Sequence, residues 1–376
     1  MKILIIKNDG IGDLILTSGI IASIAAQPGY EVDLVTCEAS KEIATQIPGL
    51  HSVSYVSRDQ ISFLNIGDAD KQVLQRLLKI KYDKAIVLRR FIRQSTFVIM
   101  NYVHAKEKFC FWQYPSNVST AVAEEESMGW THIQGNERTL HELEYYRDVL
   151  QNVFEFDLSL KPSLGFSVDP NQIQRNEKSI GMILSGASSR WPMENWKRLI
   201  LQIIADNWTV SLFGGPEDRP FAEEMKKNIG GVRAFAGKLT FEQSVDELSN
   251  QSIVVGNDTG LTHLAGMYSQ TLLVIQGGGT FGRFFPWPET IHDQYLVYRP
   301  MKCFDCDWRC KLDVRECIEL ITVEDVYGAI RRIENKSQIE KNIVLGPWAG
   351  AYQLAWKRGG GIQNGLRSTI TIDCTH

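Results

Sequence analysis

The chain has 376 residues, 44% of them hydrophobic and 22% charged, with a net charge of −4 and a pI near 6.0. At roughly 150 residues per domain this length predicts two domains. The composition excludes a mostly disordered, collagen-like or small disulfide-stapled protein. It supplies no general basic field, so nucleic acid is not an expected partner.

The N-terminal region has the plan of neither a membrane anchor nor a signal peptide. The longest weakly polar stretch, 14–26, contains Thr17 and Ser18 and is shorter than the roughly 20 apolar residues of a bilayer span. The first apolar run, 3–6, is short and ends at Lys7. We therefore expect a cytoplasmic protein, with at most a peripheral contact at the inner face of the membrane.

The first half of the chain alternates strand and helix patterns. Short apolar runs at 3–6, 32–35 and 85–88 predict buried strands. A helix pattern follows the first run at 14–26, and apolar residues at three-to-four spacing over 140–153 predict another helix. This alternation is typical of a parallel sheet with crossover helices.

A polar stretch without either period, 161–178, separates this half from a second alternation. We therefore predict a first domain at 1–168 and a second at 169–336. For the tail, 337–376, which shows no clear period, the hypothesis is that it packs back on the first domain. The expected strands of the second domain are 180–184, 209–213, 253–255 and 271–275, and its helices are 194–205, 220–228 and 241–250.

The fold class predicted from this pattern is α/β, with two Rossmann-like doubly wound domains facing a central cleft. Ligands of such sheets bind outside the carboxyl ends of the strands. The loops that follow the strands are therefore where we expect the chemistry.

The first of these loops is Gly10-Ile11-Gly12-Asp13. Position 15 is Ile15 rather than the third glycine of a dinucleotide fingerprint, which disfavours an NAD-dependent dehydrogenase. The two glycines allow a tight turn that presents Asp13 in the first turn of the next helix. The plain alternative is a carboxylate that only complements the helix dipole.

A second loop, 257–260, joins an apolar strand to a helix pattern. Backbone N–H groups of Thr259 and Gly260 at the positive end of a helix form a seat for a phosphate. Asp258 would repel that phosphate, so we expect it to cap the helix or accept from a sugar hydroxyl. The alternative is a plain capped helix in which His263 is a satisfied core histidine.

Two further loops follow strands of the second half. In Ser185–Pro192 the small residues leave room for a ligand, hydroxyls such as that of Ser188 can donate to phosphate oxygens, and Arg190 can pair with a diphosphate. In Phe213–Glu217 the carboxylate of Glu217 can accept from a ribose. Surface turns are the alternative for both.

Three arginines follow the predicted strand 85–88. Arg89, Arg90 and Arg93 can bind an anionic acceptor such as a phosphorylated glycan. A cluster that only faces water is the alternative.

Four cysteines lie within one short segment, at Cys303, Cys306, Cys310 and Cys317. Four thiolates can close around a tetrahedral zinc or iron ion. Because the segment follows the last cleft loop, we expect a structural knuckle that fixes a loop or a homo-oligomer contact. Free buried cysteines or a pair of disulfides are the alternative.

Taken together, the order of these loops resembles glycosyltransferase family 9, the ADP-heptose:lipopolysaccharide heptosyltransferases, over about residues 1–330. The resemblance implies the GT-B fold and makes Asp13 the general base. One departure is Arg190, since family members usually carry a lysine just before the Trp-Pro pair. The candidate donor-binding residues are Gly12, Ser188, Arg190, Glu217, Asp258, Thr259, Gly260 and His263.

The function that follows from the resemblance is inverting glycosyl transfer. The expected donor is a nucleotide-diphospho-sugar, most simply ADP-heptose, and the acceptor is a hydroxyl of a surface glycan, a lipopolysaccharide core, a glycolipid or a protein. The chemistry needs no cofactor. The alternatives are a GT-B nucleotide-sugar epimerase and a noncatalytic nucleotide-binding or metal-knuckle assembly protein.

Overall fold

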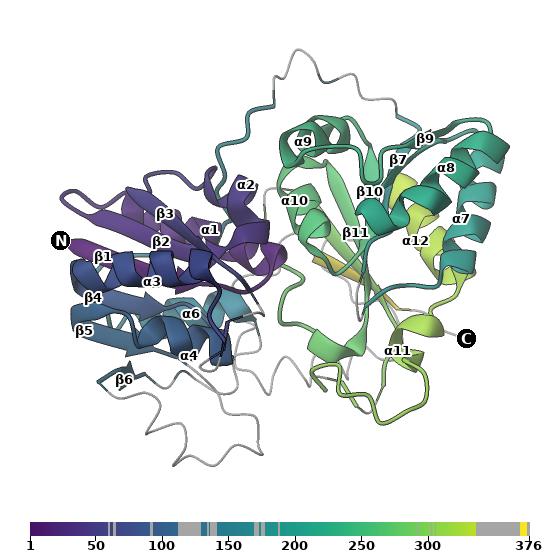
Figure 1. The fold of residues 1–376 in the computed structure, drawn as a ribbon. Helices are drawn as coiled ribbons and strands as arrows, with labels where there is room; N and C mark the ends of the chain where they lie inside the picture. Colours follow the sequence, from purple (N-terminus) through teal and green to yellow (C-terminus); the bar gives the residue numbers. More distant parts are fainter. Residues whose placement is uncertain are drawn as a thin grey trace. The chain divides into compact units, whose positions relative to one another are not determined.

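The chain divides into two compact units, Met1–Gly165 and Phe166–His376, each with a parallel sheet of its own (Figure 1). The division lies three residues before the expected boundary. The computed structural model describes residues 1–376 except 59–60, 63–64, 91–92, 112–128, 134, 136–140, 169–172, 174–176, 187–188, 291, 302, 305, 336–368 and 374–376.

The first unit is built on a six-stranded sheet of order β3-β2-β1-β4-β5-β6, in which every neighbouring pair is parallel. Its strands are β1 (Lys2–Lys7), β2 (Glu31–Cys37), β3 (Ser52–Val56), β4 (Lys81–Val87), β5 (His104–Cys110) and β6 (Thr131–His132). Its helices are α1 (Ile11–Ala25), η1 (Glu38–Ser40), α2 (Lys41–Ala44), α3 (Asp68–Lys79), α4 (Gln94–Met100) and α6 (Glu142–Leu150).

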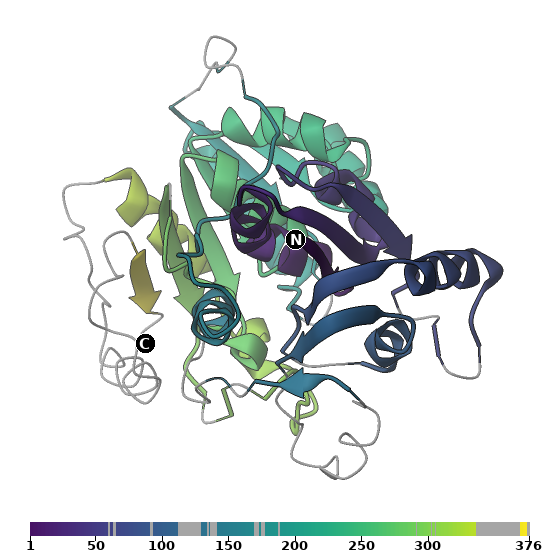
Figure 2. The ribbon, with the colours of Figure 1, turned by 90° about the vertical axis from the view of Figure 1, so that its left-hand side faces the viewer.

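Helices cover both faces of this sheet (Figure 2). Leu74 and Leu77 of α3 and Val98 of α4 pack with Leu4 and Ile6 of β1 in one hydrophobic cluster. Helices α1 and α6, which contact each other, cover the opposite face. Since both faces are covered, the central strands are apolar on both sides, which is why they read as continuous runs in the sequence.

The second unit is built on a seven-stranded parallel sheet of order β13-β12-β11-β10-β7-β8-β9. Its strands are β7 (Ser179–Ile183), β8 (Thr209–Phe213), β9 (Val232–Ala234), β10 (Ile253–Asn257), β11 (Thr271–Gln276), β12 (Asp293–Tyr298) and β13 (Thr369–Asp373). Its helices are α7 (Met193–Ala205), η2 (Pro216–Asp218), α8 (Arg219–Asn228), α9 (Phe241–Ser249), α10 (Gly260–Tyr268), η3 (Gly278–Thr280), α11 (Glu316–Glu319) and α12 (Val323–Glu334).

The core of the second unit lies between its sheet and the helices α7, α8 and α12. Trp191 and Trp196 pack edge to face with ring centroids 5.1 Å apart, and the Trp191 indole N–H donates to the carbonyl of Ile321 at 2.8 Å. Helices α9 and α10 contact each other away from this cluster. In the tail, β13 pairs with β12, so this segment belongs to the second sheet.

Both sheets confirm the predicted doubly wound α/β fold, and each contains a point where the strand order reverses. These points lie between β1 and β4 in the first unit and between β7 and β10 in the second. Connections leave the two strands toward opposite faces there, which opens a crevice at the carboxyl ends. The described helices include none that is long and apolar enough to cross a bilayer.

Candidate active site

Asp13 lies at the reversal point of the first sheet, where β1 passes into α1. Gly10 is the N-cap of α1, and its backbone N–H donates to Oδ2 of Asp13 at 3.1 Å. An added Cβ on Gly10 would come within 2.8 Å of that oxygen, so glycine is needed for the approach. The carboxylate therefore caps the helix, as the plain alternative expected, and remains partly exposed.

Burial and several nearby charged groups shift the pKa of this carboxylate. Desolvation by the surrounding protein raises the pKa of Asp13, and the carboxylates of Asp9 and Glu142 raise it further. The cations of Lys7 and Arg89 lower it. A carboxylate whose pKa is raised is a better proton acceptor when it is ionised, which is the property a general base needs.

Two of the three arginines after β4 are buried, so these two do not belong to the solvated cluster that was the alternative. Arg89 is buried and donates to the carbonyl of Asn8 at 3.3 Å and to the hydroxyl of Thr96 at 3.4 Å. Arg90 is also buried, with its guanidinium 4.5 Å from the ring centroid of Tyr145. Only Arg93, at the N-cap of α4, is exposed.

In the second unit, Asn257 joins the two loops at the reversal point. Its side-chain N–H donates to the carbonyl of Ser185 at 2.9 Å, and its Oδ1 accepts from the backbone N–H of Trp191 at 3.0 Å. The sequence offered no reason to single out this buried amide. It holds the loop after β7 against the loop after β10, where a ligand of this sheet would bind.

The Asp258 carboxylate contacts side chains from the end of β11, from η3 and from α10. Its Oδ2 accepts from the hydroxyl of Thr280 at 3.3 Å and from the Gln276 side chain at 3.5 Å, and its Oδ1 lies 3.6 Å from Nε2 of His263. The N-cap residue of α10, Thr259, makes no side-chain capping hydrogen bond, and the first backbone N–H groups, at Gly260, carry the positive end of the helix.

His263 is buried, and its ring stacks on Phe285 at 4.4 Å and on Trp287 at 6.0 Å between centroids. Within the described part of the chain its Nδ1 has no hydrogen-bond partner. The buried ring of His263 thus lies against the Asp258 carboxylate and supports it.

Arg190 is held by the protein in this structure. Its Nη2 donates to Oδ1 of Asp218 at 2.8 Å and its Nε to the carbonyl of Gly186 at 2.9 Å. Asp218 also accepts from the backbone N–H of Gly215 at 2.9 Å. The predicted Glu217 is exposed, whereas its buried neighbour Asp218, which the sequence analysis did not single out, makes the contacts. Ser188 lies outside the described residues.

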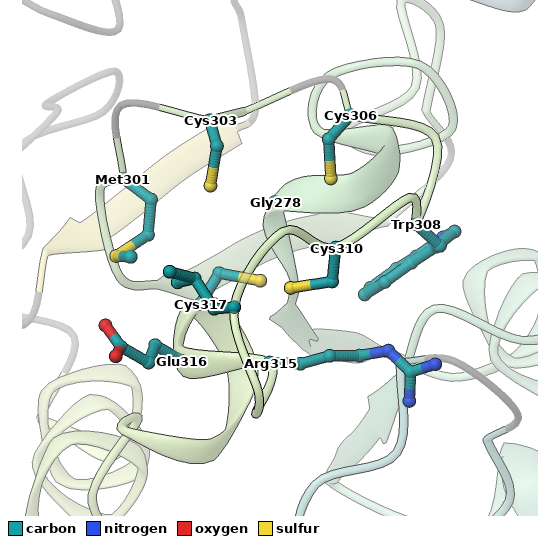
Figure 3. A pocket seen from close by; sticks show the side chains of 10 residues that line it. Gly278, Met301, Cys303, Cys306, Trp308, Cys310, Arg315, Glu316 and Cys317 are labelled. Carbon is teal, nitrogen blue, oxygen red and sulfur yellow. The ribbon is translucent and has the colours of Figure 1, made fainter.

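The four cysteines line one small hollow and their sulfur atoms point toward one another (Figure 3). The hollow has room for roughly one water or ion. All four are free thiols. Burial raises the pKa of Cys317, and the other three cysteines add to that rise. In the described ranges, no group of three or more His, Cys, Asp or Glu side chains is placed to hold a metal ion as it stands.

Two doubly wound units, with Asp13 at the reversal point of one sheet and the start of α10 at that of the other, agree with a glycosyltransferase of the GT-B fold. The model of glycosyltransferase family 9 (heptosyltransferase) matches residues 72–311, so the chain belongs to that family. Lipooligosaccharide heptosyltransferase 2 of Haemophilus influenzae is 24% identical over 317 residues, which cover 74% of this chain and 83% of that protein.

Solved structures show the same fold. A family 9 glycosyl transferase from Veillonella parvula has a TM-score of 0.66 at 16% identity, covering 89% of this chain and 97% of that one. Escherichia coli heptosyltransferase WaaC with ADP-2-deoxy-2-fluoro heptose has a TM-score of 0.61 at 17% identity, covering 89% and 100%. The iron-containing dodecameric glycosyltransferase TibC from E. coli has a TM-score of 0.51 at 14% identity, covering 89% and 76%.

Proposed function

We propose that this enzyme transfers a heptose from ADP-heptose to a hydroxyl of a lipopolysaccharide-core glycan, with inversion at the anomeric carbon and with Asp13 as general base. The observation that carries the proposal is the Asp13 carboxylate at the reversal point of the first sheet, with its pKa raised by desolvation. The donor and acceptor follow the printed names of the relatives, a lipooligosaccharide heptosyltransferase and a structure with an ADP-heptose analogue.

In this mechanism Asp13 takes the proton of the acceptor hydroxyl as the oxygen attacks the anomeric carbon. The bond to the diphosphate breaks on the opposite face, and ADP leaves with the electron pair. The N–H groups of Thr259 and Gly260 stabilise the charge that develops on the diphosphate, together with Ser188 and with Arg190 once it turns from Asp218. Asp258, His263 and Glu217 position the donor sugar and ribose.

The acceptor is proposed to be anionic. With Arg89 and Arg90 buried, Arg93 carries the exposed positive charge after β4 that would meet an acceptor phosphate.

The test of the base is Asp13→Asn. Loss of a general base lowers a rate by roughly 10²- to 10⁴-fold, so kcat, measured as ADP release with acceptor present, should fall by that range. The ADP dissociation constant from calorimetry should not change, because the proposed ADP contacts lie in the second unit. Asp68→Asn, at a carboxylate 94% exposed on α3, is the matched control. Wild-type turnover by Asp13→Asn would overturn the proposal.

We also propose that Cys303, Cys306, Cys310 and Cys317 bind one structural zinc or iron ion. Support comes from the common hollow that the four thiols line and from an iron-containing protein of similar fold. Binding requires small rotations of the side chains and loss of the thiol protons. The ion would tie the segment to the loop after β11, where the Gly278 N–H already hydrogen-bonds to Cys317.

Elemental analysis of the purified protein checks this. About one equivalent of zinc or iron per chain is expected, with loss in Cys306→Ser and retention in Cys37→Ala, a buried thiol of the first unit. A wild-type protein without either metal, or equal content in Cys306→Ser, would refute the site. The homo-oligomer expected from this segment stays a prediction, which light scattering checks.

A further inference from the structure

Beside Asp13 lies a buried ion pair for which the proposed mechanism has no use. Nζ of Lys7 lies 2.8 Å from Oδ2 of Asp9, and the Lys7 side chain is only 1% exposed. A lysine is rarely buried to this extent, because its charge must leave water. A hydrophobic pair of similar size often stabilises a fold as well or better, so the pair calls for another explanation.

The surroundings of the pair are built around charge. Nζ of Lys7 lies 5.3 Å from the ring centroid of Tyr146, on α6. The hydroxyl of Tyr146 accepts from the backbone N–H of Arg90 at 3.1 Å. Oδ1 of Asp9 is buried and has no hydrogen-bond partner among the described residues. One oxygen of Asp9 is therefore paired with Lys7, and the other has no hydrogen-bond partner in the described part of the chain.

We propose that the Lys7–Asp9 pair is a positioning element for the Asp13 carboxylate: the turn that holds the buried pair also holds Asp13 through the Gly10 N–H, so that the two charges of the pair act on the base. This inference rests on the proposed function, since it gives Asp13 the role of base. Lys7 and Asp9 are positioning residues here, because they act through Asp13.

The direction of each effect follows from its charge. After desolvation, the negative charge of Asp9 is the largest influence that raises the pKa of Asp13, and the positive charge of Lys7 is the largest that lowers it. Lys7 ends β1, and Asp9 directly precedes Gly10, whose backbone N–H donates to Oδ2 of Asp13 at 3.1 Å, so the turn that carries the pair also holds the carboxylate. The other groups that face this carboxylate are Glu142 and Tyr146 from α6, Arg89 after β4, and Arg58 after β3, whose guanidinium lies 3.9 Å from the Cβ position of Gly10.

The experiment is the pH profile of kcat/KM for Lys7→Met and Asp9→Asn in the full chain. The acid limb reports the pKa of the free enzyme's base. Lys7→Met removes the cation, so its limb should move to higher pH, with activity lost on the acid side and recovered as the pH rises. Asp9→Asn should move the limb to lower pH and lower the plateau, because a weaker base transfers the proton less readily.

The double variant Lys7→Met/Asp9→Asn tests whether the position of the acid limb is rescued. Both charges are removed together, so the acid limb should return toward its wild-type position. Lys71→Met/Asp68→Asn, which removes an exposed pair 3.4 Å apart on α3, should leave the limb where it is. If the pair had only a structural role, its removal would change the thermal stability and leave the acid limb of every variant in place. That result would overturn the inference.

A second readout does not depend on turnover. Carboxyl ¹³C NMR titration of Asp13, in whichever variants fold by circular dichroism, should show the same opposite shifts. If Asp13→Asn is fully active, the proposed function fails. If Asp13→Asn is inactive but the acid limb and the NMR titration of both Lys7→Met and Asp9→Asn stay at their wild-type positions, only the role of the pair fails.

Discussion

At the N-terminus of α1 a single side chain serves two purposes that oppose each other. The Asp13 carboxylate accepts from the Gly10 N–H, which helps to begin the helix. Its desolvation, however, raises its pKa, so the ionised form that the proposed mechanism needs is the form the folded protein holds less well.

Asp13→Asn should therefore stabilise the protein near neutral pH. The pKa of Asp13 is higher folded than unfolded, so ionisation costs stability as the pH rises above the unfolded value of about 3.9. Below that pH both states are protonated and the cost vanishes. We expect a higher Tm for the variant at about pH 7 and similar values near pH 3, by calorimetry across pH. A variant that is less stable at about pH 7 would contradict this pKa direction.

At the scale of the elements, glycine has opposite effects on the stability of helices α1 and α12. A Cβ on Gly19 of α1 would lie 1.9 Å from the carbonyl oxygen of Lys161. A Cβ on Gly328 of α12 would meet nothing within 4 Å. The first glycine allows the chain that ends the first unit to approach the helix, and the second only costs backbone entropy.

Gly19→Ala and Gly328→Ala should thus change stability with opposite signs. Overpacking costs typically ~1–3 kcal/mol, whereas alanine in place of an unhindered helical glycine gains ~0.5–1 kcal/mol. Urea unfolding followed by circular dichroism measures both. Equal effects of the two substitutions would mean that α1 does not approach residues 159–161 as closely as the structure shows.

At the scale of the whole molecule, the two units have separate sheets and cores, so a ligand of one unit can be recognised by where it protects the chain. ADP at 100 times its dissociation constant stabilises its site by roughly 2.7 kcal/mol. Hydrogen exchange should slow in β10, α10 and the loop after β7, and stay unchanged in β1 and α1. Protection confined to the first unit would move the proposed ADP site away from α10.

Much of the architecture followed from the sequence, because a strand covered on both faces must be apolar on both sides. The apolar runs at 3–6 and 253–255 predicted β1 and β10. The glycines and polar residues that follow these runs in the sequence predicted the loops that carry Asp13 and Gly260. The carboxyl ends of parallel strands place such loops at one edge by topology alone.

The sequence by itself determined the two doubly wound units, the family and the loops to which the proposed chemistry is assigned. Only the tertiary structure decided which side chains meet there. Glu142 comes to Asp13 through the packing of α6 on α1. Asp218 rather than Glu217 holds Arg190, because the short 3₁₀ turn exposes Glu217 and buries Asp218. The local pattern of apolar and polar residues in the sequence indicates whether a residue is buried. The partner of a buried charge depends on strand order and helix packing, which join residues far apart along the chain.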